Sequence, residues 1–94
     1  MPDKKRVTLA LACEYLKFDF ITAIEFADFG LFPVYRKGKT VLIAVDDFTL
    51  LKKVVSFHSV LGVNKEGIDI ILELSERLIQ LESQLAAPHN NYLA

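Results

Sequence analysis

The residues whose side chains could carry out chemistry are few and widely spaced. The sequence has one cysteine, Cys13, and two histidines, His58 and His89. Cys13 lies on the apolar stripe of a predicted helix, which favours core packing over nucleophilic catalysis. One Cys and two His at no ligand spacing predict no zinc site. Asp46 and Asp47 are neighbours whose side chains diverge, so a helix N-cap explains this carboxylate pair. We expect no enzyme, no metal and no cofactor.

The composition is that of a small protein with enough apolar material for one core. The chain has 94 residues, 52% of them hydrophobic, and its formal net charge is −1. This charge gives no general attraction to nucleic acid or to an anionic membrane. The N-terminus lacks a signal-peptide pattern, no segment is long enough to span a bilayer, and one cysteine allows no internal disulfide. We expect one domain in a reducing, cytoplasmic compartment.

Apolar spacing and capping residues divide the chain into four helices and one hairpin. Thr8, Asp19 and Asn64 stand where helix N-caps are expected, and Gly30 stands at a helix C-terminus. A run of β-branched and aromatic residues, interrupted by Lys37 and Gly38, predicts the hairpin. The predicted helices cover residues 8–16, 20–29, 46–61 and 65–87, and the predicted hairpin covers residues 34–45.

The order helix, helix, hairpin, helix, long helix is mainly α and is typical of a winged helix-turn-helix. The segments "FADFGLFP", "KGKTVLIAVDDFTLLKKV" and "LGVNKEGIDIILEL" follow in this order and resemble the MerR-type family. The resemblance covers about residues 8–85 and implies a MerR-like winged helix-turn-helix with a small β-hairpin and a long C-terminal helix. The expected division is a basic N-terminal tail at 1–7, the winged domain at 8–63, a packing and dimerisation helix at 64–87 and a tail at 88–94.

The second helix departs from the MerR-type pattern in its charge. MerR-type regulators carry an Arg near the middle of this helix, and the matching position here is Ile24. The stretch "FDFITAIEFADFG" carries three carboxylates and no cation. DNA affinity depends on cations that neutralise phosphates, so we expect no sequence-specific DNA binding. Weak phosphate contact is left to the predicted wing tip, with Arg36, Lys37 and Lys39.

An acidic second helix is also a feature of the chaperone-modulator (CbpM) family, to which this sequence is similar. The similarity includes the acidic segment "DFITAIEFADFGLFP", the Leu-Gly-Val spacer and the Gly67-Ile68 entry to a Leu-rich final helix. It implies a regulator that binds the J-domain of a DnaJ- or CbpA-like co-chaperone and inhibits it. The sequence differs in the apolar residues Phe20, Ile21 and Ile24, where that family has a more polar helix.

The second helix is apolar on nearly every side. We expect Ala23, Phe26 and Phe29 to belong to the core. The remaining apolar residues are either covered by the first helix, the hairpin or a second subunit, or form a partner-binding patch rimmed by charge. The residues predicted to bind a partner are Asp19, Phe20, Ile21, Ile24, Glu25 and Asp28.

The last helix carries an apolar stripe with the 3-4-3-4 spacing of a coiled-coil seam. Its residues, Ile71, Leu74, Leu78, Leu81 and Leu85, predict a homodimer. A second stripe of Ile68, Leu72 and Ile79 would pack on the winged domain. The alternative is one broad stripe that packs entirely on its own domain.

Two functions of different classes remain. The first is a protein-binding regulator that occupies a J-domain and blocks its contact with a DnaK-type chaperone by steric competition. The second is a small MerR-like DNA-binding or accessory transcription factor that works through the wing and the N-terminal "KKR". The charge of the second helix favours the first.

Overall fold

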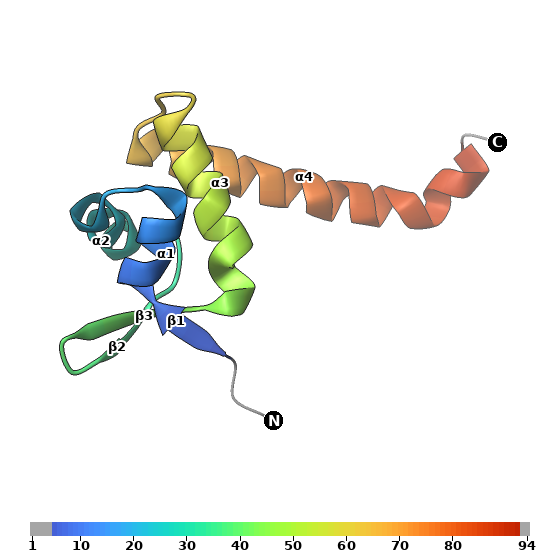
Figure 1. Ribbon diagram of the computed structural model, residues 1–94. Helices are drawn as coiled ribbons and strands as arrows, with labels where there is room; N and C mark the ends of the chain where they lie inside the picture. Colours follow the sequence, from blue (N-terminus) through green and yellow to red (C-terminus); the bar gives the residue numbers. More distant parts are fainter. Residues whose placement is uncertain (1–4, 93–94) are drawn as a thin grey trace.

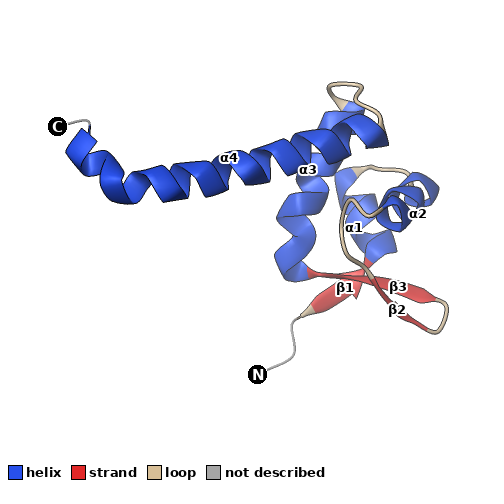
Figure 2. Ribbon diagram, turned by 180° about the vertical axis from the view of Figure 1, so that it is seen from behind, coloured by secondary structure: helices blue, strands red, loops and turns tan. Residues whose placement is uncertain are grey.

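The computed structural model describes the backbone of residues 5–92 and the side chains of residues 5–85. A globular part is followed by one long helix that projects from it (Figures 1 and 2). This is the expected winged helix-like fold, mainly helical with a small antiparallel sheet. The elements are β1 (Arg6–Thr8), α1 (Leu9–Leu16), α2 (Phe20–Phe29), β2 (Tyr35–Lys37), β3 (Thr40–Ala44), a 3-10 turn η1 (Val45–Asp47), α3 (Phe48–Ser59) and α4 (Lys65–Tyr92).

The hairpin β2–β3 forms the expected wing, and a third strand joins it. The strand order is β1-β3-β2, with Val7 opposite Ile43 and Arg36 opposite Val41. We predicted a basic tail at residues 1–7, and this is wrong for Arg6 and Val7, which lie in β1. Three residues are too few to show a period-2 pattern, so only the pairing with β3 reveals the strand. Residues 1–4 lie outside the part that the structure describes.

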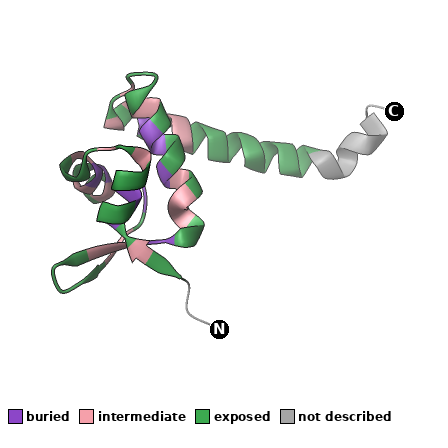
Figure 3. Cartoon of the chain, in the orientation of Figure 1, coloured by how far each residue is buried: buried purple, intermediate pink, exposed green. Residues whose placement is uncertain are grey.

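The core lies between α1, α2, α3, the sheet and the first turns of α4 (Figure 3). The predicted stripes of α1 and α3 supply much of it, since Leu9, Cys13, Leu51 and Val54 are buried. Burial raises the pKa of the Cys13 thiol, which fits a packing role. Leu61, the last residue of the helix predicted over 46–61, is 65% exposed and lies beyond the end of α3 at Ser59.

The start of α3 differs in detail from the expected cap. Asp47 occupies the N-cap position, but its side chain makes no capping hydrogen bond. The turn η1 precedes it and brings the chain directly from the end of β3 into the helix. A short 3-10 turn tightens the chain enough to start a helix without a side-chain cap.

The helix α4 begins as predicted and ends later. Asn64 Oδ1 accepts a hydrogen bond from the Gly67 N–H at 2.8 Å, which caps the first turn. A Cβ on Gly67 would lie 2.7 Å from Val63 Cγ1, so any other residue here would require the Val63 side chain to shift. We predicted a tail from residue 88, whereas the helix continues through Pro88 to Tyr92. The side chain of His89 lies outside the part that the structure describes.

Candidate functional site

The helix α2 is positioned by caps at both of its ends. Asp19 Oδ2 accepts hydrogen bonds from the Thr22 N–H and the Thr22 hydroxyl, both at 2.9 Å. The bond from the Thr22 N–H is the main cause that lowers the pKa of the Asp19 carboxyl, and the hydroxyl adds to it. At the other end Gly30 adopts φ 102°, and its N–H bonds to the carbonyls of Phe26 and Ala27. Both predicted caps are confirmed.

One side of α2 is held by an aromatic cluster of the core. Phe26 is 4% exposed and Ala23 is fully buried, as predicted. The ring of His58 lies edge-on to the rings of Phe26 and Phe18, with centroids 5.0 and 6.0 Å apart. His58 Nδ1 lies 3.0 Å from the Val63 carbonyl oxygen, which ties α3 to the turn before α4. His58 is therefore a packing residue between helices.

The opposite side of α2 faces solvent. Ile21, Glu25 and Asp28 lie at positions i, i+4 and i+7 and form one stripe, which we call the α2 face. Ile21 is 72% exposed, so neither α1 nor the hairpin covers it. The exposed Phe20 and Phe29 lie at the flanks of this stripe.

Two of the expected positions on α2 are wrong. Phe29, expected in the core, is 41% exposed, because it lies at the last turn beyond the reach of α1 and α3. Ile24, expected on the exposed face, is half-buried and packs against the core cluster. When a helix is apolar on every side, its sequence does not show which of its apolar residues are buried and which are exposed. The role of Ile24 in partner binding stays a prediction.

The carboxylates of the α2 face are paired with cations from distant parts of the chain. Lys65 Nζ donates to Glu25 Oε2 at 2.6 Å, and Arg36 Nη2 donates to Asp28 Oδ1 at 2.8 Å. The Glu25 carboxylate is the main cause that raises the pKa of Lys65. The side chains of Glu25 and Asp28 remain 56% and 62% exposed, so a partner could still reach them.

The wing is less cationic in the structure than in the sequence. The Arg36 guanidinium turns back to α2, while Lys37 and Lys39 at the tip are exposed. Arg6 of the "KKR" segment lies 4.0 Å from the centroid of the Tyr35 ring and so packs on the wing. Lys4 lies outside the described residues. Of the wing's cations, Arg36 already has an anionic partner in this chain.

The predicted dimerisation residues form an exposed stripe on α4. Leu74, Leu78, Leu81 and Leu85 are between 54% and 60% exposed, and Ile71 is half-buried. Beyond Ile71 the stripe is exposed, and most of α4 projects past the globular part (Figure 3). Of the second stripe, Ile68 is fully buried and Leu72 packs on the core, whereas Ile79 is exposed. Dimerisation itself stays a prediction.

Sequence reasoning missed three hollows in the described part of the structure. One of about 440 Å³ lies beside the α2 face, between Glu25, His58 and Lys65. An apolar groove of about 490 Å³ runs between α1 and the start of α3, lined by Leu11, Tyr15 and neighbouring residues. The i, i+4 spacing of Leu11 and Tyr15 was a possible signal for it.

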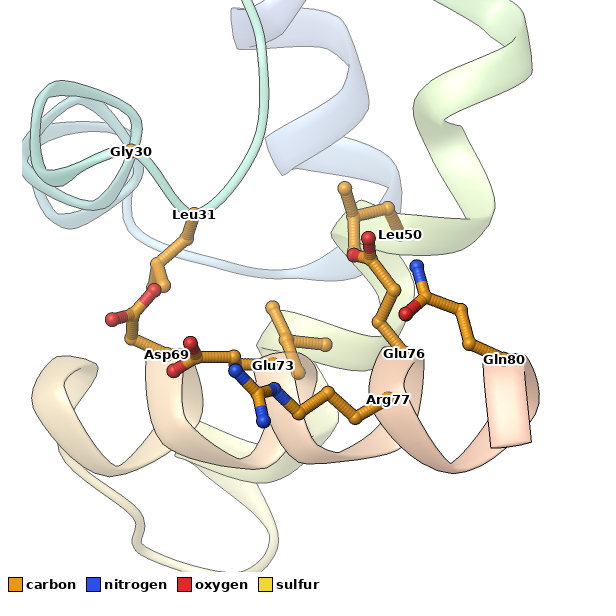
Figure 4. Close-up of a pocket in the computed structure, with 9 residues that line it drawn as sticks. Gly30, Leu31, Leu50, Asp69, Glu73, Glu76, Arg77 and Gln80 are labelled. Carbon is orange, nitrogen blue, oxygen red and sulfur yellow. The ribbon is translucent and has the colours of Figure 1, made fainter. Parts of the chain in front are cut away.

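The third hollow is a crevice of about 590 Å³ between α4 and the globular part (Figure 4). Its apolar side includes Leu31 and Leu50, and its α4 side includes the carboxylates of Asp69, Glu73 and Glu76. These acids come from successive turns of one helix, so the crevice would favour cationic groups over anionic ones.

Among the described residues, no group of three or more His, Cys, Asp or Glu side chains could hold a metal ion. Within the same part of the chain, no helix is long and apolar enough to cross a membrane. The α2 face combines exposed apolar side chains with paired carboxylates, an arrangement suited to binding through burial of apolar area and exchange of ion pairs.

Comparison with known proteins identifies the family. A family model described as "MerR HTH family regulatory protein" matches residues 7–89, which is most of the chain. No curated protein and no solved structure gives a significant match. The match covers the winged helix-turn-helix and most of α4, in agreement with the fold. The chain belongs to the MerR HTH family of regulatory proteins.

Proposed function

We propose that this protein is a cytoplasmic regulator that uses the α2 face to bind the J-domain of a DnaJ- or CbpA-like co-chaperone. The observation that carries the proposal is the composition of α2. The second helix of the helix-turn-helix presents Ile21 with two carboxylates to solvent and has no cation.

A protein partner fits this surface better than DNA. Glu25 and Asp28 on the exposed face would repel phosphates, and the missing cations remove the main source of DNA affinity. The exposed Ile21, flanked by Phe20 and Phe29, offers an apolar centre with charged neighbours. Apolar patches with a charged rim are typical of protein interaction sites.

The charge of the α2 face selects for a basic partner. The resemblance to the chaperone modulators implies a J-domain partner. J-domains carry a basic helix beside their His-Pro-Asp motif. The carboxylates of both internal ion pairs are more than half exposed, so solvent screens these pairs and each contributes little to stability. Exchange of Lys65 or Arg36 for a partner cation is therefore inexpensive, and the apolar residues would supply most of the affinity.

The mechanism is steric competition. A J-domain held by its basic helix cannot present that helix to a DnaK-type chaperone at the same time. No covalent step and no cofactor are needed, because occupancy of the surface is itself the inhibition. The degree of inhibition would then equal the fraction of the J-domain that is bound. This fraction depends on the dissociation constant and on the concentration of the regulator.

Titration calorimetry against a J-domain protein from the same organism tests the proposal. We expect binding by the wild type and a loss of about 2 kcal/mol or more in Ile21→Asp if this residue is the central anchor. Leu11→Asp is the matched control, since Leu11 is also an exposed aliphatic residue but lies on α1. If Ile21→Asp binds at full strength, the α2 face is not the site.

A DNA-binding or accessory transcription role is the second candidate. The observations in its favour are the family match and the two exposed lysines of the wing tip, Lys37 and Lys39. A regulator of this second kind would bind duplex DNA without any J-domain protein present. Fluorescence anisotropy with labelled duplex and with labelled J-domain distinguishes the two.

A further inference from the structure

The hollow beside the α2 face lies where the start of α4 meets α2. It has a volume of about 440 Å³ and is bordered by three helices. The residues around it include Glu25 and Phe26 of α2, His58 of α3, and Lys65 and Glu66 of α4. We call this hollow the Glu25 recess. It adjoins the α2 face directly, because Glu25 belongs to both.

A cation of the chain itself already lies at this recess. Lys65 Nζ donates to Glu25 Oε2 at 2.6 Å and lies 5.5 Å from the centroid of the Phe29 ring. The pKa of Lys65 is raised mainly by its hydrogen bond to Glu25 and further by the charge of Glu66. A carboxylate and an aromatic ring around one ammonium form an environment that favours cations. The place occupied by Lys65 is therefore one that accepts a basic side chain.

Lys65 uses only part of the acceptor capacity of the recess. Its ammonium bonds to Glu25, whereas the Glu66 carboxylate forms no hydrogen bond and no ion pair among the described residues. The Glu25 side chain is 56% exposed, and a carboxylate has more lone pairs than one ammonium can fill. Two carboxylates on different helices thus border one hollow and keep acceptor positions free.

A guanidinium fits these surroundings better than an ammonium. It is planar and presents five N–H donors in a fixed fork, so it can bond to two carboxylates and stack on an aromatic ring. The rings of Phe26 and His58, with centroids 5.0 Å apart, supply the aromatic wall of the recess. We propose that the Glu25 recess receives one arginine side chain of the protein that binds the α2 face, in exchange for Lys65.

This exchange rests on the proposed function, because it needs a protein partner on the α2 face. A partner lysine would replace one ammonium with another, whereas a partner arginine gains the contact with Glu66. A guanidinium is also less strongly hydrated than an ammonium, so the exchange returns the more hydrated group to water. Glu66 is then the residue that determines specificity, and the partner is a basic segment with an arginine beside its apolar contact with Ile21.

Two basic peptides of equal charge test the recess without any J-domain protein. Both are capped, alanine-rich helical peptides of about 15 residues, one with arginine and one with lysine at every fourth position. NMR titration of each peptide into the isotopically labelled full chain gives a dissociation constant. The amide shifts of Thr22, His58 and Glu66 locate the contact. Because the peptides carry the same charge, general attraction cancels in the ratio of their dissociation constants.

We expect the arginine peptide to bind about three-fold or more tightly than the lysine peptide, with shifts at the recess. Glu66→Gln should bring this ratio close to one. Glu82→Gln is the matched control and should keep the ratio, since this exposed acid of α4 lies on the order of 25 Å further along the helix. Lys65→Met should bind the arginine peptide about two- to five-fold more tightly, because no resident cation has to leave.

Equal binding of the two peptides by the wild type would overturn the arginine receptor. So would a preference that survives Glu66→Gln, or the absence of shifts at the recess. Calorimetry with a J-domain protein separates this result from the proposed function. Equal affinity of that protein for the wild type and Glu66→Gln would overturn the receptor alone. An arginine preference that depends on Glu66, without any binding of a J-domain protein, would overturn the J-domain partner and support the receptor.

Discussion

The Nζ atom of Lys65, the first residue of α4, lies 2.6 Å from Oε2 of Glu25 on α2. The same amine lies 5.5 Å from the centroid of the Phe29 ring. One cation thus connects the long helix to the α2 face, 40 residues away in sequence, and neutralises one of its carboxylates. The charge that a partner meets on α2 depends on this contact.

Removal of that cation should make the α2 face more attractive to a basic partner. Lys65→Met keeps a long apolar stem over Phe29 and frees the Glu25 carboxylate. We expect faster association with a J-domain in stopped-flow measurements at low salt, and a gain that shrinks as salt screens the charge. Lys52→Met, on the exposed side of α3, is the matched control and should change the rate less. A gain that is independent of salt would argue against an electrostatic cause.

Three substitutions in α2 should separate its two sides. Phe26→Ala removes a core ring and should lower the free energy of unfolding by roughly 3–5 kcal/mol. Ile21→Asp is at an exposed position and should change it by less than about 0.5 kcal/mol. Ile24 is half-buried, so Ile24→Asp should lower the free energy of unfolding by an intermediate amount, about 1–3 kcal/mol. Urea denaturation measures all three. A strongly destabilised Ile21→Asp would mean that Ile21 is covered in solution.

Binding to DNA should be weak and independent of sequence. In a gel-shift series with the DNA upstream of its own gene, we expect retardation at low salt only, through Lys37 and Lys39. Asp28→Lys should strengthen this weak binding, because it removes the partner that holds Arg36 and adds a cation beside it. A wild-type complex that persists at physiological salt and prefers one sequence would contradict this expectation.

The cap of α2 should make stability depend on pH in the acid range. The pKa of Asp19 in the folded protein lies below its ordinary value of 3.8, because its carboxylate accepts bonds from Thr22. The ionised cap therefore stabilises the fold above the unfolded pKa, and this contribution is lost as pH falls through the lower folded pKa. Asp19→Asn keeps a capping oxygen that does not titrate.

Urea denaturation of both proteins between about pH 2 and pH 6 measures this contribution. The advantage of the wild type over Asp19→Asn should shrink steadily toward the acid end of the range. An advantage of constant size across the range would show that the Asp19 carboxyl has the same pKa in the folded and unfolded chains.

Local signals were sufficient for most of the architecture. Thr8, Asp19, Gly30 and Asn64 marked helix ends correctly, because a cap acts within one turn of the chain and depends on few neighbours. The apolar spacing of α1 and α3 identified core residues for the same reason. The order of the elements then indicated the winged fold. The acidic character of α2 was also visible, since charge is a property of composition alone.

The tertiary structure decided what each residue of α2 faces. A helix that is apolar all round contains no periodic signal, so only the packed neighbours show that Ile24 is half-buried while Ile21 and Phe29 are exposed. The strand β1 exists because β3 pairs with it, and no local pattern in three residues predicts such a partner. The ion pairs Glu25–Lys65 and Asp28–Arg36 depend on how α4 and the wing dock on α2. Composition determined the charge of α2, and the docking of α4 and the wing determined which of its carboxylates are neutralised within the chain.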